Sequence, residues 1–148
     1  MKNKFKGFTL VELLLVVTIL GILAAIAMPK LFPQTEKARV AEAIAILQSI
    51  RQGEAAYFLE KETYCDPNAV SGGCEGSWNG LGMDNPNPGR YFTYSVTLVA
   101  AVAGLPAGFD ATATRRTDVS DPGGTYGGKK ITIDETGTYA GDHPFRPT

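Results

Sequence analysis

Glu12 is the only charged residue in an apolar run that extends from Phe8 to Met28. A carboxylate within a membrane-length apolar segment is costly to keep out of water, so it indicates a function and a partner. The run has 21 residues, and a helix of that length is roughly 31 Å long, enough to cross the bilayer core. We therefore expect a membrane-spanning helix, and the partner we expect for Glu12 is another copy of the same segment.

Two cysteines, Cys65 and Cys74, are separated by eight residues in a stretch rich in Gly, Asn and Ser. If this stretch lies outside the cytoplasm, an oxidising compartment permits a disulfide between them. A closed loop of this size stabilises a fold by roughly 2–3 kcal/mol in the chain-entropy model. A metal-binding cysteine pair is the alternative, but no further cysteine or histidine lies close in sequence to complete a set of four ligands. We predict the disulfide.

Residues that could carry out catalysis are scarce. His143 is the only histidine, and it lies between Asp142 and Pro144 near the C-terminus, where we expect a surface or tail residue. The sequence contains no Ser-His-Asp order, phosphate-binding loop or helical histidine pair. We therefore predict that the chain is not an enzyme and that it needs no cofactor.

Several carboxylates gather in the Gly-rich C-terminal third, where loops could supply the oxygen ligands that calcium prefers. They are Asp118, Asp121, Asp134, Glu135 and Asp142. No EF-hand spacing is present, and solvated turn residues explain the acids equally well. We predict no metal site and keep calcium as an alternative.

The length of 148 residues fits one domain, and the formal net charge is −1. Loss of Lys2, Lys4 and Lys6 with a leader changes the charge to −1 − 3 = −4, before the new amino terminus is counted. That balance argues against nucleic acid as a main partner. The same three lysines should hold the start of the apolar run in the cytoplasm.

An ordinary secretory signal peptide is the alternative interpretation of the N-terminus, because such signals are cleaved at small residues after the apolar region. Ala24, Ala25 and Ala27 could supply that site. This interpretation gives no reason for the sequence Phe8-Thr9-Leu10-Val11-Glu12, and we do not adopt it.

The helical pattern continues past the apolar run. Pro29 and Pro33 are potential kinks, because proline lacks the N–H that a helix needs. Residues 36–62 then show apolar side chains at helical spacing, with polar residues on the rest of the circumference. The apolar positions are Val40, Ala43, Ile44, Leu47, Ile50, Tyr57 and Phe58.

Beyond the helix, residues 63–89 have the composition of a loop, with Trp78, Leu81 and Met83 as a small apolar anchor. We predict strands over residues 91–103, 109–115, 130–134 and 138–140. Short strands with short connections indicate an antiparallel meander, and the apolar helix face needs a sheet to cover it. The predicted fold is α+β: a long N-terminal helix whose second half packs on a three- to four-stranded antiparallel sheet.

The N-terminal motif resembles that of type IV prepilins and of the closely related type II secretion pseudopilins. It consists of a short basic leader ending in Gly7, the sequence from Phe8 to Leu13, the small residues of 21–27 and Pro29. The resemblance implies cleavage after Gly7 by a prepilin peptidase, N-methylation of Phe8, and a filament built around packed N-terminal helices. The implied divisions are a leader (1–7), a membrane or filament-core helix (8–28), its amphipathic continuation (29–63) and a head completed by residues 64–148.

The resemblance also implies the location and the partners. The precursor is expected in the inner membrane, where an assembly platform adds it to an extracellular homo-oligomeric filament. Glu12 is expected to meet the amino group of Phe8 on a neighbouring subunit; the alternative is that it contacts headgroups and water at the interface. We expect the segment from Gly21 to Pro29 to lose helical structure on assembly, because Gly and Pro weaken helices. A major pseudopilin of a secretion system and a minor pilin that binds surfaces or DNA are the alternative functions.

Overall fold

The computed structural model describes residues 7–68, 74, 77–89, 91–102, 107–118 and 125–148. Its contacts divide the chain into two compact units, Met1–Glu36 and Lys37–Thr148. We call the second unit the head. The basic leader lies outside the described residues, except for Gly7, and so does Asp121.

Helix α1 extends over Leu10–Lys61, a length of 52 residues. It is helical at Pro29 and Pro33. The helix ends where Glu62 adopts a left-handed backbone conformation, with φ of 58°, and donates its N–H to the carbonyl of Phe58 at 2.9 Å. This hydrogen bond satisfies one of the carbonyls that every helix leaves unpaired at its C-terminus.

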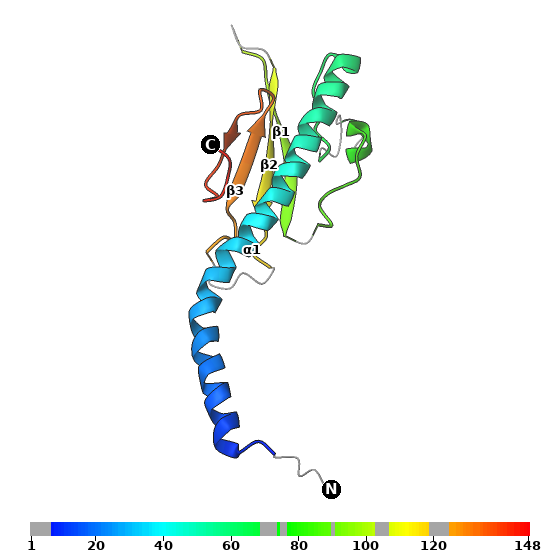
Figure 1. Cartoon of the computed structure of the whole chain (residues 1–148). Coiled ribbons are helices and arrows are strands. Elements are labelled where there is room, and N and C mark those ends of the chain that lie inside the picture. Colours follow the sequence, from blue (N-terminus) through cyan, green and yellow to red (C-terminus); the bar gives the residue numbers. More distant parts are fainter. Residues whose placement is uncertain (1–6, 69–73, 75–76, 90, 103–106, 119–124) are drawn as a thin grey trace. The chain divides into compact units, whose positions relative to one another are not determined.

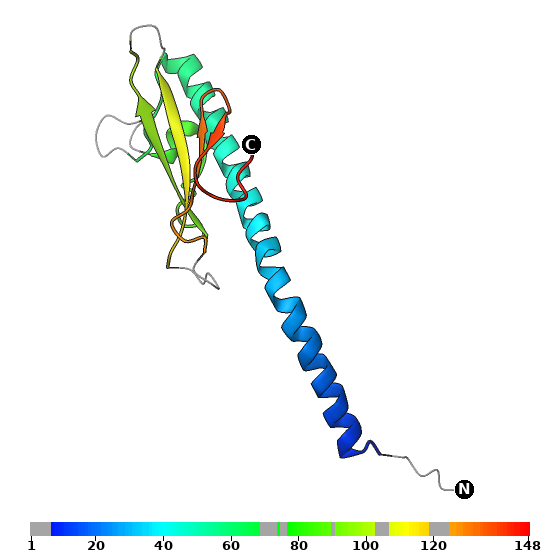
Figure 2. The same cartoon turned by 90° about the vertical axis from the view of Figure 1, so that its left-hand side faces the viewer.

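The sheet of the head is a four-stranded antiparallel meander in the order β1-β2-β3-β4. The strands are β1 (Phe92–Val99), β2 (Gly108–Arg115), β3 (Lys130–Asp134) and β4 (Tyr139–Ala140). This confirms the predicted fold class, although β1 is shorter than the predicted strand over 91–103. Figures 1 and 2 show the second half of α1 lying along one face of this sheet.

The core of the head lies between α1 and the sheet. Val40, Ala43, Leu47 and Ile50 of the helix are buried with alternate residues of β1, β2 and β3. Ala111 and Ala113 of the central strand β2 stand in register between larger residues of β1 and β3. The small side chains on β2 leave room for the helix, and the larger side chains of β1 and β3 lie on either side of it. From Phe109 onward, buried and half-exposed residues alternate along β2.

A short 3-10 helix, η1 (Trp78–Leu81), interrupts the loop that follows α1. Trp78 and Leu81 are buried, so the predicted apolar anchor of this loop is confirmed. Gly53 of α1 explains how closely the loop approaches, because a Cβ atom added there would lie 2.6 Å from the carbonyl oxygen of Leu81. Only glycine allows that contact between the helix and the loop.

Candidate functional site

The first turn of α1 carries a reciprocal pair of hydrogen bonds between Thr9 and Glu12. The backbone N–H and the hydroxyl of Thr9 each donate to Oε2 of Glu12 at 2.9 Å, and the N–H of Glu12 donates to the Thr9 hydroxyl at 3.2 Å. This is a capping box, which satisfies two backbone donors that the helix would otherwise leave unpaired. The carboxylate also lies near the positive end of the helix dipole. Within a single subunit, then, Glu12 has a structural partner as well as a charge.

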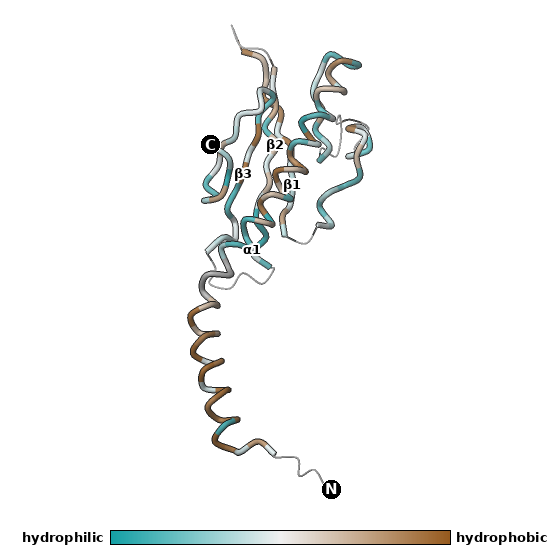
Figure 3. The backbone as a smooth tube through the Cα atoms, in the orientation of Figure 1, coloured by the Kyte–Doolittle hydropathy of each residue, from teal (hydrophilic) through white to brown (hydrophobic). Residues whose placement is uncertain are grey.

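Residues Leu10–Met28 form the one stretch, among the described residues, that is helical, long and apolar enough to cross a membrane. None of this stretch is buried within the subunit, and Figure 3 shows it coloured mostly as hydrophobic, with a hydrophilic position near its start. Its one other polar side chain inside the helix, Thr18, donates its hydroxyl to the carbonyl of Leu14 at 2.7 Å. The apolar surface therefore needs lipid or other protein chains to cover it.

Gly7, Phe8, Gly21 and Pro29 lie along the same segment. Phe8 is 88% exposed. A Cβ atom added at Gly7 or at Gly21 would meet no atom within 4 Å. The fold of the subunit itself therefore does not demand glycine at either position.

Comparisons with known proteins point to this same segment. Residues 2–28 match the model of the prokaryotic N-terminal methylation motif. The chain is 39% identical over 67 residues to a type IV major pilin protein of Neisseria gonorrhoeae, covering 45% of this chain and 41% of the relative. It is 41% identical over 61 residues to a type IV major pilin protein of Myxococcus xanthus, covering 41% of this chain and 28% of the relative.

Along its N-terminal segment the chain is therefore similar to type IV major pilins. It spans about two fifths or less of the length of these two relatives. A fimbrial protein of Eikenella corrodens is 35% identical over 72 residues, with 49% of this chain and 47% of the relative covered. No solved structure matches.

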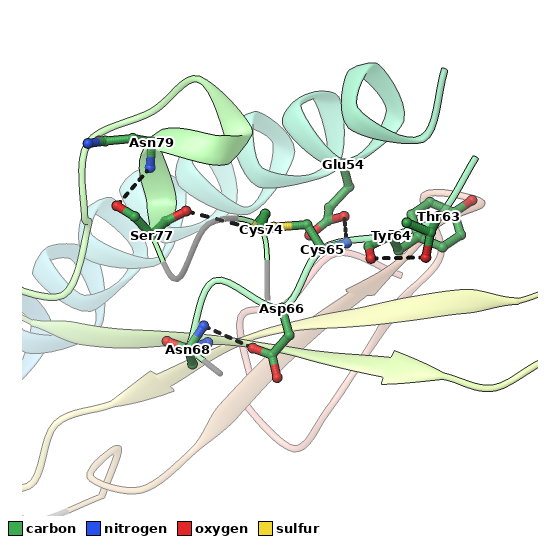
Figure 4. Close-up of a disulfide and its surroundings, with 9 residues drawn as sticks. All are labelled: Glu54, Thr63, Tyr64, Cys65, Asp66, Asn68, Cys74, Ser77 and Asn79. Atoms are coloured by element: carbon green, nitrogen blue, oxygen red, sulfur yellow. Dashed lines mark hydrogen bonds between the residues drawn. A yellow bond between two sulfur atoms is a disulfide. The ribbon is translucent and has the colours of Figure 1, made fainter. Parts of the chain in front are cut away.

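The head holds the predicted disulfide. Cys65 and Cys74 are bonded, with their Cα atoms 5.1 Å apart, and both are buried. Figure 4 shows the bridge between the helix and the neighbouring strands, with Cys65 directly beside Glu54 of α1. The bridge ties the start of the loop, just after α1, to the segment that leads into η1.

Glu54 is a functional candidate that the sequence interpretation did not single out. Its side chain is buried, and Oε2 accepts the backbone N–H of Cys65 at 2.9 Å. Burial raises the pKa of the Glu54 carboxyl from its usual 4.5 to about 7; the hydrogen bond from Cys65 opposes this and the charge of Asp66 adds to it. A signal was present in the sequence, because Glu54 follows Ile50 by four residues and so lies on the apolar stripe of α1.

His143 corrects a prediction, because it is buried rather than exposed on a tail. Its ring stacks on Tyr126 at a centroid distance of 5.7 Å and lies 6.0 Å from the ring of Phe145. Its backbone N–H donates to the carbonyl of Lys130 at 3.1 Å. The C-terminal segment is thus fastened to β3 by a hydrogen bond and an aromatic cluster, which the position of the histidine near the C-terminus did not indicate.

The C-terminal carboxylates are occupied locally. Asp118 pairs with Arg116, and Asp142 accepts from Lys129 and from the backbone N–H of Lys130. Asp134 accepts from the hydroxyl of Thr136 at 2.6 Å within a turn. Among the described residues, no group of three or more potential metal ligands comes together.

Proposed function

We propose that the chain is the structural subunit of an extracellular type IV pilus-like filament. The observation that carries this proposal is an apolar helix of 19 residues that is wholly uncovered within its subunit and lies inside the segment that matches the methylation motif. Such a surface is covered by lipid in the precursor and by the same helix of other subunits in a filament. The family of structural pilins supports a role that is not enzymatic.

In this proposal the leader of residues 1–7 is removed after Gly7 by a prepilin peptidase, and the new amino group of Phe8 is methylated. Glu12 of one subunit then pairs with the amino terminus of its neighbour. Because Glu12 also caps its own helix through Thr9, the carboxylate enters the filament with its orientation already set. A buried carboxylate needs a partner of opposite charge, which the neighbouring terminus supplies.

The precursor is held in the inner membrane by residues 8–28, and an assembly platform in that membrane transfers it into the filament. The segment from Gly21 to Pro29 loosens during this transfer, because Gly disfavours helix and Pro lacks a hydrogen-bond donor. The amphipathic residues 29–63 and the sheet of residues 64–148 form the outer layer of the filament.

The experiment is mass spectrometry and electron microscopy of material sheared from the surface of cells that express the full chain. We expect long filaments composed of a chain that begins at N-methylated Phe8. Short filaments confined to the cell envelope would instead favour the major pseudopilin of a type II secretion system. Rare incorporation at filament ends would favour a minor pilin that binds surfaces or DNA. An unprocessed chain that never leaves the membrane would contradict all three functions.

A further inference from the structure

The head has two ends, which the contacts between its elements define. At one end the start of α1 in the head lies beside the start of β1, since the guanidinium of Arg39 stands 4.3 Å from the ring centre of Tyr91. At the other end the C-terminus of α1 lies beside the start of β2, since the ring centres of Tyr64 and Phe109 are 5.1 Å apart. Figures 1 and 2 show the same two ends from different sides.

The first of these ends is rich in cations, and we call it the basic end. It carries Lys37, Arg39, Arg116, Lys129, Lys130 and Arg146. Two of these cations have countercharges in the same head, Arg116 in Asp118 and Lys129 in Asp142. Even with the neighbouring Glu36 counted, the six cations outnumber the carboxylates Asp118 and Asp142 among the described residues of this end, and Lys130 is exposed.

The opposite end is rich in carboxylates, and we call it the acidic end. It carries Glu60, Glu62, Asp110, Asp134 and Glu135, while Lys61 and Arg51 bring countercharge, the first as an ion pair with Glu60 at 2.8 Å. The carboxylates still outnumber the cations here. The two ends of one head are therefore of opposite sign.

Several of the acids are unfavourable for an isolated head. Asp110 and Asp134 stand directly opposite each other in the β2–β3 register, and like charges in that position destabilise a sheet. Glu60 and Glu62 lie at the C-terminal end of α1, where the helix dipole disfavours negative charge. Local contacts offset this cost at Glu60, which pairs with Lys61, and at Asp134, which accepts from the hydroxyl of Thr136. Glu62 is exposed and Asp110 is half-exposed, so both present a carboxylate to a partner outside the head.

Apolar surface accompanies the acids. Leu59 is 85% exposed, although it is a leucine on the last turn of α1. Tyr64, Leu98, Val99 and Gly108 line a hollow of about 290 Å³ at the same end. An apolar centre with charged residues around it is the usual composition of a docking surface rather than of a freely solvated one.

We propose that the acidic end of one head docks on the basic end of another copy of this chain. The inference rests on the proposed filament function and adds the surfaces through which successive heads meet. Complementary charge selects the partner, and because the two surfaces differ, each subunit offers a free end after binding. Such a contact does not close on itself and propagates as an open assembly. Anionic lipid headgroups could attract the basic end, but they leave the carboxylates and apolar surface of the acidic end without a role.

The test is a set of charge reversals in the full chain, read out as sheared filament per cell beside the membrane pool of subunit. The acidic-end variant is Glu60→Lys with Glu62→Lys, and the basic-end variant is Lys37→Glu with Lys130→Glu. The control for the acidic-end variant is Glu42→Lys with Asp84→Lys. It makes the same change in net charge as the acidic-end variant, at exposed sites away from the acidic end. We expect each end variant to lower filament yield about tenfold, because like charges then face each other, with the membrane pool unchanged.

The variant with both ends reversed restores opposite charges, so we expect its yield to return to within about twofold of the unmodified chain. Three results would each overturn the inference. The first is full filament yield from both single-end variants, and the second is no recovery of yield in the combined variant. The third is a loss of yield in the basic-end variant alone, accompanied by loss of its membrane pool. If the unmodified chain forms no filaments at all, the proposed function fails, and sedimentation of the detergent-solubilised chain decides the docking separately. In that measurement, the contact is supported if the unmodified chain self-associates, each single-end reversal abolishes the self-association and the combined variant restores it. Absence of self-association in the unmodified chain overturns the contact.

Discussion

The two halves of α1 bury their apolar residues in different ways. In the head, Val40, Ala43, Leu47 and Ile50 are covered by the sheet of the same subunit. From Leu10 to Met28 the same helix is even more apolar, yet none of it is covered by its own chain. The apolar side chains of the second half are buried when the subunit folds. Those of the first half become buried through contact with lipid or other subunits.

The carboxylates in these two halves differ in the same way. Glu54 lies on the buried stripe of the second half and finds its hydrogen-bond donor, the N–H of Cys65, within the head. Glu12 lies in the uncovered half and, among the described residues, is bonded to Thr9 at the start of its own helix. A charge on an apolar helix face therefore has a local structural role where the sheet and loop of the same subunit cover that face. Where no such layer covers the face, the charge is open to a second subunit.

The largest effect is expected from Gly7→Val. Leader removal should stop, so that no filaments form and the longer precursor accumulates in the membrane. Because the space around Gly7 is open, the substitution should leave the fold unchanged, and an immunoblot of chain length measures the outcome. Gly21→Ala is the matched control, a glycine with equally open surroundings outside the cleavage site, and it should be processed normally. Mature chain from the Gly7 variant would contradict the assigned cleavage site.

Substitutions at Glu12 separate its charge from its capping role. Gln preserves a capping box while removing the charge, and Ala removes both. If pairing with a neighbouring amino terminus drives assembly, Glu12→Gln and Glu12→Ala should both lower the yield of sheared filament by about tenfold or more, with normal membrane insertion, since a buried charge without its partner is strongly destabilising. Filament yield by quantitative immunoblot measures this. A normal yield from the Gln variant beside a low yield from the Ala variant would show that Glu12 acts as a helix cap.

Removal of the disulfide should affect the head alone. We expect Cys65→Ser with Cys74→Ser to lower the free energy of unfolding of the head by about 2–3 kcal/mol, because the unfolded chain regains the entropy of an open loop. Thermal unfolding of the detergent-solubilised chain, with and without reductant, measures the loss. Leader cleavage in the same variant serves as the control for the N-terminal half and should be unchanged. An unaltered melting temperature would contradict a stabilising bridge.

The stability of the head should depend on pH through Glu54. Its pKa is about 7 in the folded state against the usual 4.5, so the folded state binds the proton more tightly than the unfolded state. The stabilisation is complete below pH 4.5 and is lost as pH rises through 7. We expect a loss of about 1–2 kcal/mol across this window, allowing for solvent screening. Urea titrations at several pH values measure it, and Glu54→Gln should flatten the profile; an equally steep profile in that variant would assign the effect to other groups.

The smallest effect is expected from Gly21→Ala. Alanine favours helix by about 1 kcal/mol relative to glycine, and the added Cβ meets no atom within 4 Å. If residues 21–29 loosen on assembly, this variant should show slower amide exchange at 21–28 in assembled filaments. Hydrogen exchange with mass spectrometry measures the change, with peptides from the head as internal reference. Complete protection of this segment in filaments of the unmodified chain would contradict the loosening.

Local pattern was sufficient for much of the fold. The alternation along β2 and the helical stripe from Val40 to Ile50 predicted their buried faces because each repeats with the period of its element. The disulfide was predictable because no nearby ligands competed for the two cysteines. At the N-terminus, the run of apolar residues around a single acid identified the candidate segment without reference to tertiary structure.

The features that sequence interpretation missed depend on contacts between distant residues. Glu54 is buried because the loop carrying Cys65 folds back over α1, a contact that periodicity does not encode. His143 is buried because Tyr126 and Phe145 converge on it from two segments. Arg115, at the end of β2, is buried and donates to the carbonyl of Tyr91 at 3.2 Å.

The central claim is that the uncovered half of α1 is covered by other copies of itself. Electron cryomicroscopy of sheared filaments tests this directly. We expect residues 8–28 of successive subunits packed together in the filament interior, with the carboxylate of Glu12 within hydrogen-bonding distance of the amino group of a neighbouring Phe8. Helices on the filament exterior, or a Glu12 carboxylate bonded to Thr9 alone within that interior, would contradict the account.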